Sequence, residues 1–267
     1  MHKELALIGC GAMGTAIVSG ILGAGLLPPE AVTVSTHSPV SAARLADELG
    51  CPATADNTEA ARGAKIVFLA VKPPLIPEVA AEIAPVLAPD AVVVSVAAGV
   101  TLERLEELLG SECKIARVMP NLPAMVGAGM SALSPNRQMD TEEVDRVKRL
   151  LEGFGKAEVV PEGQMDAVVA VSGSGPAYVC LFIEALADAG VAEGMPRGSA
   201  YTFAEQTVLG TAAYLMETGV HPAVLKDRVC SPSGTTIAAV AALEERGLRS
   251  AVIEAARACA RRNRELG

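Results

Sequence analysis

Three glycines near the N-terminus have the spacing of a phosphate-binding turn. Gly9, Gly11 and Gly14 follow an apolar run that begins at Glu4, and an Ala-rich helical pattern continues to Gly20. In a strand–turn–helix, the first glycine allows the tight turn, the second lets a pyrophosphate approach, and the third lets the helix pack closely on the strand. The free N–H groups at the helix start then face the phosphates. The pattern predicts a dinucleotide site at Gly9, Cys10, Gly11, Ala12, Met13 and Gly14. A glycine turn in some other α/β protein is the alternative.

The next β-branched run, Ala31–Ser35, ends without an acidic residue. An Asp or Glu at this place usually accepts a hydrogen bond from the ribose 2′-hydroxyl and repels a 2′-phosphate. Here the chain continues with Thr36, His37 and Ser38, whose hydroxyls and imidazole suit a phosphate. We therefore expect NADPH to be preferred, with NADH possible. A plain polar turn before a helix is the alternative.

Later segments extend the predicted cofactor site. In the loop Asp56-Asn57-Thr58, the Asn could meet the adenosine, although Asp and Asn are also ordinary helix caps. Lys65–Val71 and Ala91–Val96 have the pattern of buried strands, and prolines force the first out of the sheet at its carboxyl edge, where ligands bind in doubly wound folds. We expect cofactor contacts from Ala70, Val71, Lys72, Pro73, Val96, Ala97 and Ala98. For Lys72, a solvated surface charge is the alternative.

Two hydroxyl-rich segments interrupt the apolar helical patterns of the second half. Ser172–Tyr178 places three hydroxyl-bearing side chains and a proline within one such pattern, and Ser231–Thr236 opens another. The second is typical of an anion cradle, with free N–H groups and hydroxyls at a helix N-terminus. The same residue types also form a plain N-cap turn, so spacing alone leaves both interpretations open.

The elements that position these residues fall into two groups. Strand patterns stop near Val160–Gly163, and helical patterns separated by Gly/Pro breaks follow from about Gln164. We predict an α/β protein, with an N-terminal Rossmann-type doubly wound sheet over residues 1–162 and an all-helical C-terminal dimerisation domain over residues 163–267. A strand is expected at Gly127–Leu133 and helices at Thr141–Gly153, Met165–Gly190, Arg197–Glu217, Pro222–Val229, Thr235–Arg246 and Arg249–Glu265. The predicted helices carry more apolar surface than a small helical domain can bury within itself, which favours a homo-oligomer formed through this domain.

Composition excludes several classes of function. The 267 residues carry a formal charge of −9, and Lys and Arg are scattered except for a cluster near Arg257–Arg264, so a nucleic-acid partner is not expected. Six cysteines show no C-x-x-C pair and no metal-ligand spacing, which indicates small buried side chains in a reducing compartment and no metal. Only three residues precede the first strand, so no signal peptide is expected. The most apolar later run, Ala167–Ile183, is broken by Ser172–Pro176, which argues against a membrane span. We expect a cytoplasmic protein.

Taken together, these segments resemble the pyrroline-5-carboxylate reductase family. The resemblance covers essentially the whole chain and is carried by Gly9–Gly14, Ala70–Pro73, Met119-Pro120-Asn121, Ser172–Tyr178, Leu225-Lys226-Asp227, Ser231–Thr236, Leu243-Glu244 and Gly247-Leu248-Arg249-Ser250. It implies reduction of the ring imine of 1-pyrroline-5-carboxylate to L-proline with NAD(P)H, the last step of proline synthesis. It also implies dimers formed through interlocked helical domains, often assembled into larger rings.

The resemblance also assigns roles by position. It places the cofactor at the glycine turn, Ser38, Asn57, Ala70–Pro73 and Val96–Ala98. It places the substrate at Ser174, Gly175, Pro176, Ser231, Pro232, Ser233, Gly234, Thr235 and Thr236. Many members of the family have two glycines after the loop proline, whereas this chain has Ser233-Gly234. A serine there adds a donor or narrows the loop, which affects the tightness of substrate binding and not the reaction.

The residue types in these loops suit imine reduction. A pyrroline imine is partly protonated near neutral pH, so hydride addition needs little acid catalysis beyond a group that hydrogen-bonds the ring nitrogen, for which Thr236 is the candidate. Most of the rate enhancement would come from positioning. A β-hydroxyacid dehydrogenase or a general cyclic-imine reductase is the nearest alternative. Alcohol oxidation needs a base, and Lys226 is the only lysine in the helical part. An NADPH-binding regulatory or scaffold protein without catalysis is disfavoured, because both loops are intact except at Ser233.

Overall fold

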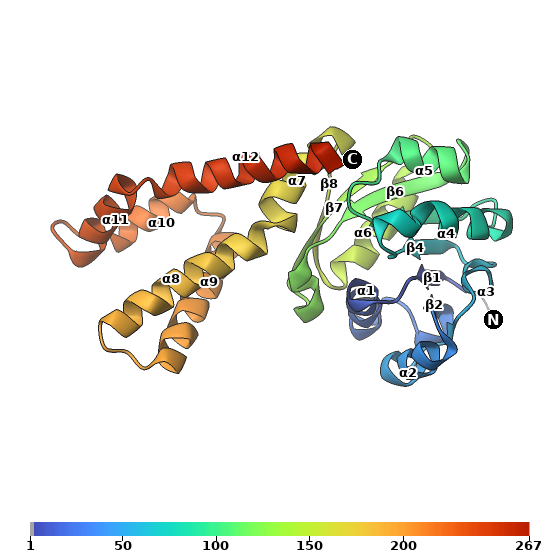
Figure 1. Ribbon diagram of the computed structural model, residues 1–267, viewed down its shortest axis with the longest axis horizontal. Coiled ribbons are helices and arrows are strands. Elements are labelled where there is room, and N and C mark those ends of the chain that lie inside the picture. The colour runs from blue at the N-terminus through green and yellow to red at the C-terminus, as the bar shows by residue number, and fades with distance from the viewer. Residues whose placement is uncertain (1–2, 267) are drawn as a thin grey trace. The chain divides into compact units, whose positions relative to one another are not determined.

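The computed structural model describes residues 3–266, and within this range the N-terminal part is an eight-stranded sheet between helices (Figure 1). The strand order is β3-β2-β1-β4-β5-β6-β7-β8. The strands are β1 (Leu5–Ile8), β2 (Val32–Ser35), β3 (Ala53–Thr54), β4 (Ile66–Leu69), β5 (Val92–Ser95), β6 (Lys114–Met119), β7 (Gly129–Pro135) and β8 (Gly155–Val159). All neighbours pair in parallel except β6 and β7. The order reverses at β1, as in a doubly wound nucleotide-binding sheet.

Alternating side chains of the central strands build two cores, one on each face of the sheet. Leu5 and Leu7 of β1 point to one face and Ala6 and Ile8 to the other, all fully buried. The first face is covered by α1 (Ala12–Gly23), α2 (Pro39–Leu49) and α6 (Thr141–Glu152). The second is covered by α3 (Asn57–Ala61), α4 (Ile76–Ile83) and α5 (Leu102–Leu109). Burial on both faces explains why the central strands are almost continuously apolar.

The far edge of the sheet differs in detail from the prediction. The strand expected at Gly127–Leu133 runs from Gly129 to Pro135, antiparallel to β6. The edge strand β8 was not predicted, because its sequence GKAEV alternates charged and small residues and its side chains are mostly exposed. The α/β fold class with its doubly wound N-terminal sheet and helical C-terminal domain is confirmed.

The remaining elements are helical, and the chain divides into two compact units. The first unit comprises the residues up to Gly173 together with those from Cys259 onward, and the second comprises Ser174–Ala258. The prediction of one continuous helix over Met165–Gly190 was wrong, because α7 (Met165–Val168) runs into a π-helix (Val169–Gly173) before α8 (Gly175–Ala192). The other helices are α9 (Arg197–Thr218), α10 (Pro222–Val229), α11 (Thr235–Glu245) and α12 (Leu248–Leu266).

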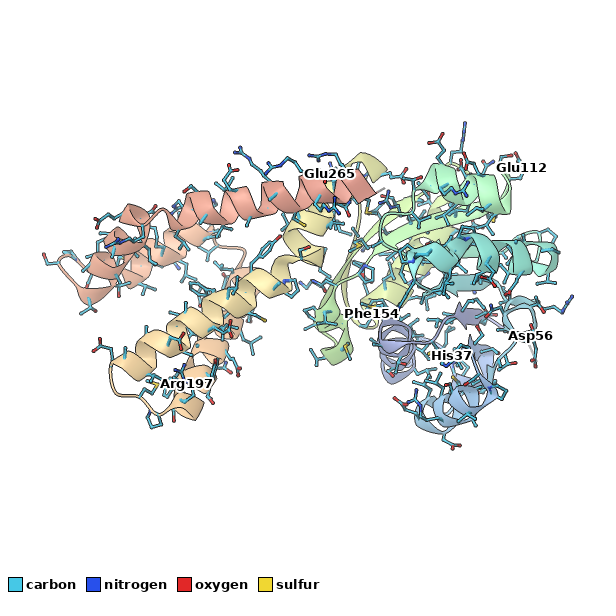
Figure 2. The ribbon with its side chains drawn as sticks, viewed as in Figure 1. His37, Asp56, Glu112, Phe154, Arg197 and Glu265 are labelled. Atoms are coloured by element: carbon cyan, nitrogen blue, oxygen red, sulfur yellow. The ribbon has the colours of Figure 1, made fainter. Side chains whose placement is uncertain are left out.

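Helices α8 and α9 form an antiparallel hairpin within the second unit. At its turn, Arg197 pairs with Asp188 at 2.5 Å (Figure 2 labels Arg197). The stretch Glu162–Ala192 is long and apolar enough to cross a membrane by length and composition alone, with a mean hydropathy of 1.5, and 11% of its most apolar window is buried. Large apolar side chains on α8 and α9 are exposed in the single chain, including Leu181, Phe203 and Leu209. These faces therefore need a partner surface of some kind.

Candidate active site

The glycine turn between β1 and α1 has a separate constraint at each glycine. Gly9 has φ +87°, a conformation that side chains rarely adopt, and a Cβ there would overlap the Val71 side chain and lie 3.0 Å from the Val71 nitrogen. At Gly14, a Cβ would lie 2.8 Å from Leu7 Cδ2 and 3.1 Å from the Gly9 oxygen. At Gly11, a Cβ would meet no heavy atom within 4 Å. The first and third glycines are thus required by the protein itself, whereas the face of Gly11 is open.

The sheet brings the expected cofactor residues to one edge. Residues 9–11, 36–38, 70–73 and 96–98 directly follow β1, β2, β4 and β5, which are parallel neighbours. All four segments therefore leave the sheet at its carboxyl edge. This edge, next to the reversal of strand order at β1, is the usual ligand site in open parallel sheets.

The turn after β2 holds the residues expected at the 2′ position of the ribose. Thr36 is buried, and its Oγ1 lies 3.5 Å from Nδ1 of the exposed His37 (Figure 2). Ser38 caps α2, where its hydroxyl accepts from the Ser41 nitrogen at 3.2 Å and donates to the Ser41 hydroxyl at 3.0 Å. Arg44 pairs with Glu48 at 2.7 Å and shares with Gly11 a pocket of about 360 Å³.

The amide of Asn57 is held by two side chains. Its Oδ1 accepts from the Ser35 hydroxyl at 2.8 Å, and its Nδ2 donates to Glu82 at 2.6 Å. The cap of α3 is Asp56, which accepts from the side chain and nitrogen of Thr58 and from a further backbone N–H. The Thr58 hydroxyl and these backbone groups lower the pKa of Asp56. Of the two residues that the capping interpretation allowed, Asp56 is therefore the cap and Asn57 is not.

The segments after β4 and β5 differ in exposure. Lys72 is exposed and precedes a short 3₁₀ turn over Pro73–Leu75. Ala97 is buried and Ala98 is exposed. A pocket of about 230 Å³ lies between the two segments and is lined by Pro73, Ile76, Pro77, Ala98, Gly99, Val100, Arg104 and Leu108.

The residues expected on the substrate side lie in the second unit. Gly175 and Pro176 form the first turn of α8 after Ser174. The Gly234 nitrogen donates to the Ser231 oxygen at 3.0 Å, which closes a turn with Pro232 and Ser233 at its centre. Ser233 has φ +58° and is the only residue other than glycine with positive φ among residues 3–266. A proline followed by a residue with positive φ is typical of a type II turn, which favours glycine at the second central position.

The same turn leads into α11 without a side-chain cap. Gly234 is the N-cap residue, and a Cβ there would overlap the Ser231 hydroxyl. The first N–H groups of α11 have no acceptor within their own helix. Thr236, in this first turn, is half-buried. The loop thus has the donors that an anion cradle requires.

Lys226 is unsuited to the base that the dehydrogenase alternative requires. It is partly exposed and lies 2.6 Å from Asp227. That hydrogen bond raises the pKa of Lys226 above its ordinary value. The ammonium form therefore dominates at neutral pH and cannot accept a proton from an alcohol.

Sequence reasoning missed a partly buried ion pair between Arg117 and Glu162. Arg117 of β6 is 9% exposed and donates to Glu162 at 2.9 Å, and the same carboxylate oxygen accepts from the Leu102 nitrogen at 2.7 Å. Arg117 and Glu162 border a pocket of about 480 Å³ that Asp166 and Asn263 also line. The only signal in the sequence is a charged residue within the apolar run KIARV, which does not identify its partner.

Comparison with known proteins identifies the family. Residues 162–266 match the family described as pyrroline-5-carboxylate reductase dimerisation, and residues 4–99 match the one described as NADP oxidoreductase, coenzyme F420-dependent. The pyrroline-5-carboxylate reductase of Escherichia coli (strain K12) is 49% identical over 266 residues, which cover 100% of this chain and 99% of that protein.

Solved structures agree over the same extent. A pyrroline-5-carboxylate reductase from Coxiella burnetii has a TM-score of 0.95 and 35% identity, covering 100% of this chain and 99% of that one. The Plasmodium falciparum pyrroline carboxylate reductase, solved with NADP bound, has a TM-score of 0.87 and 31% identity, covering 99% and 98%. The resemblance inferred from the sequence is confirmed: the chain belongs to the pyrroline-5-carboxylate reductase family.

Proposed function

We propose that this chain reduces the ring imine of 1-pyrroline-5-carboxylate to L-proline, the last step of proline biosynthesis. As a member of its family it is an NAD(P)H-dependent oxidoreductase. The observation that carries the proposal is the 49% identity to a reductase of this name over the full chain. It is supported by the glycine turn, in which the face of Gly11 is open to a ligand.

The cofactor would bind at the carboxyl edge of the sheet and supply a hydride when bound. The glycine turn and the segments 36–38, 70–73 and 96–98 would hold it, with Asn57 on the adenosine side. The absence of an acid after β2 supports NADPH as the preferred cofactor. The hydroxyl of Ser38 and the guanidinium of Arg44 are the nearest candidates for a 2′-phosphate, although both already have partners within the chain.

The substrate carboxylate would bind at the uncapped start of α11. The turn Ser231–Gly234 and the first N–H groups of α11 supply donors, and Ser174, Gly175 and Pro176 would line the substrate on another side. The Thr236 hydroxyl would hydrogen-bond the imine nitrogen and so stabilise the protonated imine. Since neither loop carries a histidine or a carboxylate, we assign the rate enhancement to orientation in a site that excludes water.

The helical region would form a homodimer, and dimers would assemble into a larger ring. Its match to the dimerisation domain of the family implies a homo-oligomer. Together with this match, the exposed apolar side chains of α8 and α9 support a second copy of the chain as their cover. We therefore propose a cytoplasmic enzyme whose residues 163–267 serve dimerisation and substrate binding and whose residues 1–162 bind the cofactor.

Initial rates with the two cofactors test this proposal. Purified protein is mixed with pyrroline-5-carboxylate and with NADPH or NADH, and loss of the reduced-nicotinamide absorbance is followed. We expect substrate-dependent oxidation and a higher kcat/KM with NADPH. A higher kcat/KM with NADH would contradict the interpretation of residues 36–38, and oxidation with neither cofactor would contradict the activity.

A further inference from the structure

The side chain of Asn121 joins three segments of the first unit. Asn121 follows β6 and occupies the N-cap position of a 3₁₀ turn over Leu122–Val126, yet it makes no capping hydrogen bond there. Its Oδ1 instead accepts from the Met130 nitrogen at 2.8 Å. Its Nδ2 lies 3.2 Å from the Ser172 hydroxyl and 3.3 Å from the Ser172 carbonyl oxygen. An Asn in a favoured capping position is thus used for contacts distant in the sequence.

The carbonyl of Ser172 lacks the donor that a regular helix would give it. In an α-helix that donor is the N–H of the residue four positions later, and here this residue is Pro176, which has none. The next N–H along the chain, that of Ala177, donates to the Ser174 oxygen at 3.1 Å and not to Ser172. Asn121 therefore supplies from its side chain the hydrogen bond that the proline removes.

The π-helix is also held by close packing at this point. A Cβ at Gly173 would lie 2.9 Å from Cε of Met119, the last residue of β6. π-Helical turns are uncommon and occur frequently at functional sites. The backbone immediately before Ser174 is thus fixed against the end of β6 by packing at Gly173 and by the amide of Asn121.

We propose that Asn121 is a positioning residue for the reduction. By holding the Ser172 carbonyl, it fixes the backbone that presents Ser174, Gly175 and Pro176 to the substrate. This role rests on the proposed function, which assigns those three residues to the substrate. Asn121 itself touches neither reacting atom in this account.

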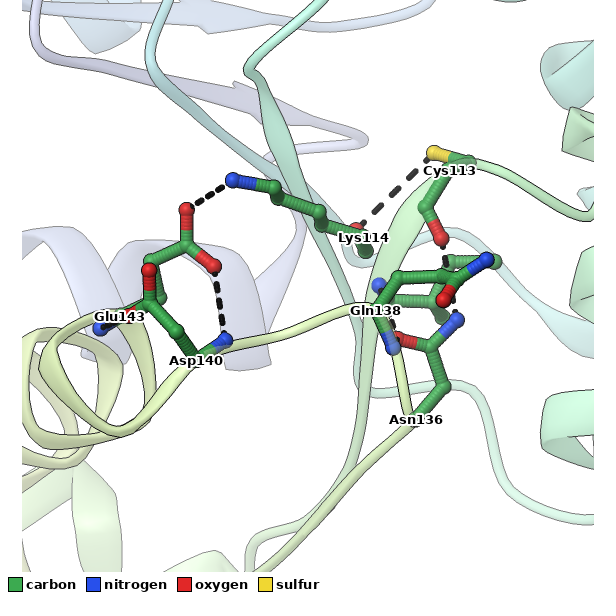
Figure 3. Close-up of polar contacts among 7 residues, drawn as sticks. Cys113, Lys114, Asn136, Gln138, Asp140 and Glu143 are labelled. Atoms are coloured by element: carbon green, nitrogen blue, oxygen red, sulfur yellow. Dashed lines mark hydrogen bonds and ion pairs between the residues drawn. The ribbon is translucent and has the colours of Figure 1, made fainter.

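Asn121→Asp tests the role, and Asn136→Asp is its matched control. The aspartate keeps the Oδ1 acceptor for the Met130 nitrogen and removes the donor to Ser172. Asn136, which is buried, also accepts from a backbone nitrogen, that of Ile115 at 3.1 Å. Its Nδ2 donates to the Cys113 carbonyl oxygen at 2.9 Å (Figure 3) and to Glu106 at 3.0 Å. It lies next to the amino-terminal end of β6, away from the carboxyl edge of the sheet.

Both variants and the parent chain are assayed as the full protein, well below their melting temperatures. We expect Asn121→Asp to lower kcat/KM for pyrroline-5-carboxylate at least tenfold with less than twofold change in the Kd for NADPH. The Asn136→Asp variant should have a lower unfolding free energy but the same kcat/KM and the same NADPH Kd as the parent chain. Equal kinetic effects of the two variants would overturn the role, as would an NADPH Kd that changes as much as kcat/KM does. If the parent chain itself fails to turn over, the proposed function has failed, and not this role alone.

Restoring the missing donor gives a second test. Pro176→Ala returns an N–H to position 176, so Asn121→Ala should cost a smaller factor in kcat/KM in the Pro176→Ala background than in the parent chain. Equal factors in both backgrounds would show that the Ser172 carbonyl is not the group through which Asn121 acts.

Discussion

Replacing Gly11 and Gly14 by alanine, one at a time, should separate cofactor binding from folding. At Gly14, the new Cβ would lie 2.8 Å from Cδ2 of Leu7, which is fully buried, and 3.1 Å from the Gly9 oxygen. Overpacking of this kind costs about 1–3 kcal/mol of folding free energy. At Gly11, no heavy atom lies within 4 Å of the new Cβ. The loss of folding free energy at Gly11 comes only from replacing glycine by alanine at the N-cap of α1, and is at most about 1 kcal/mol.

The cost of the Gly11 methyl group should instead appear in cofactor affinity. If the pyrophosphate approaches this open face, overpacking by about 1–3 kcal/mol raises the Kd for NADPH by roughly fivefold to 150-fold. Urea denaturation gives the unfolding free energy, and fluorescence titration at fixed salt gives the Kd. A Gly11→Ala variant that loses more than about 2 kcal/mol of unfolding free energy, with an NADPH Kd like that of the parent, would refute the assignment of the turn.

Three further changes test other parts of the account. Thr236→Ala should lower kcat by roughly tenfold to a hundredfold, or about 1.4–2.7 kcal/mol of transition-state stabilisation, and unchanged kcat and KM would remove this hydroxyl from the mechanism. Ser233→Gly relieves roughly 1 kcal/mol of left-handed strain and adds about as much unfolded-chain entropy, so the unfolding free energy should stay within about 1 kcal/mol. Its KM for pyrroline-5-carboxylate should rise about fivefold if a hydrogen bond worth about 1 kcal/mol is lost, and an unchanged KM would mean that this hydroxyl does not touch the substrate. Burial raises the pKa of Cys51 to about 11, whereas an unfolded thiol titrates near about 8.5. The unfolded chain therefore releases its proton first, so this contribution to stability is complete below about pH 8 and is lost as pH rises towards about 11. Between these pH values, the urea midpoint of the Cys51→Ala variant should fall less steeply with pH than that of the parent chain. Equal slopes in the two proteins would contradict the raised pKa of Cys51.

The sequence predicted the nucleotide-binding half well because its signals are local. The glycine turn, the apolar strands and the prolines after β4 each specify backbone within a few residues. The edge strand β8 was missed because its stability comes from pairing with β7 and not from an apolar pattern. The π-helix at Val169–Gly173 was missed because hydrophobic periodicity does not distinguish one inserted residue within an apolar run.

The candidate site shows the same division between local and distant signals. Ser233 could be recognised as unusual, since proline before it and glycine after it predict a tight turn. The bond from Asn121 to Ser172 crosses 51 positions of sequence, and the ion pair of Arg117 with Glu162 crosses 45. A proline within a helical pattern, as at Pro176, leaves a carbonyl that needs another donor, but the sequence does not identify that donor.

Transfer of a labelled hydride from the cofactor to the substrate would demonstrate the proposed reduction itself. The protein is incubated with pyrroline-5-carboxylate and NADPH that carries deuterium at the reactive position of the nicotinamide, and the product is examined by mass spectrometry and chiral chromatography. We expect L-proline with one deuterium on the former imine carbon, formed in equal amount to the cofactor oxidised. Cofactor oxidation without labelled proline, or no turnover at all, would contradict it.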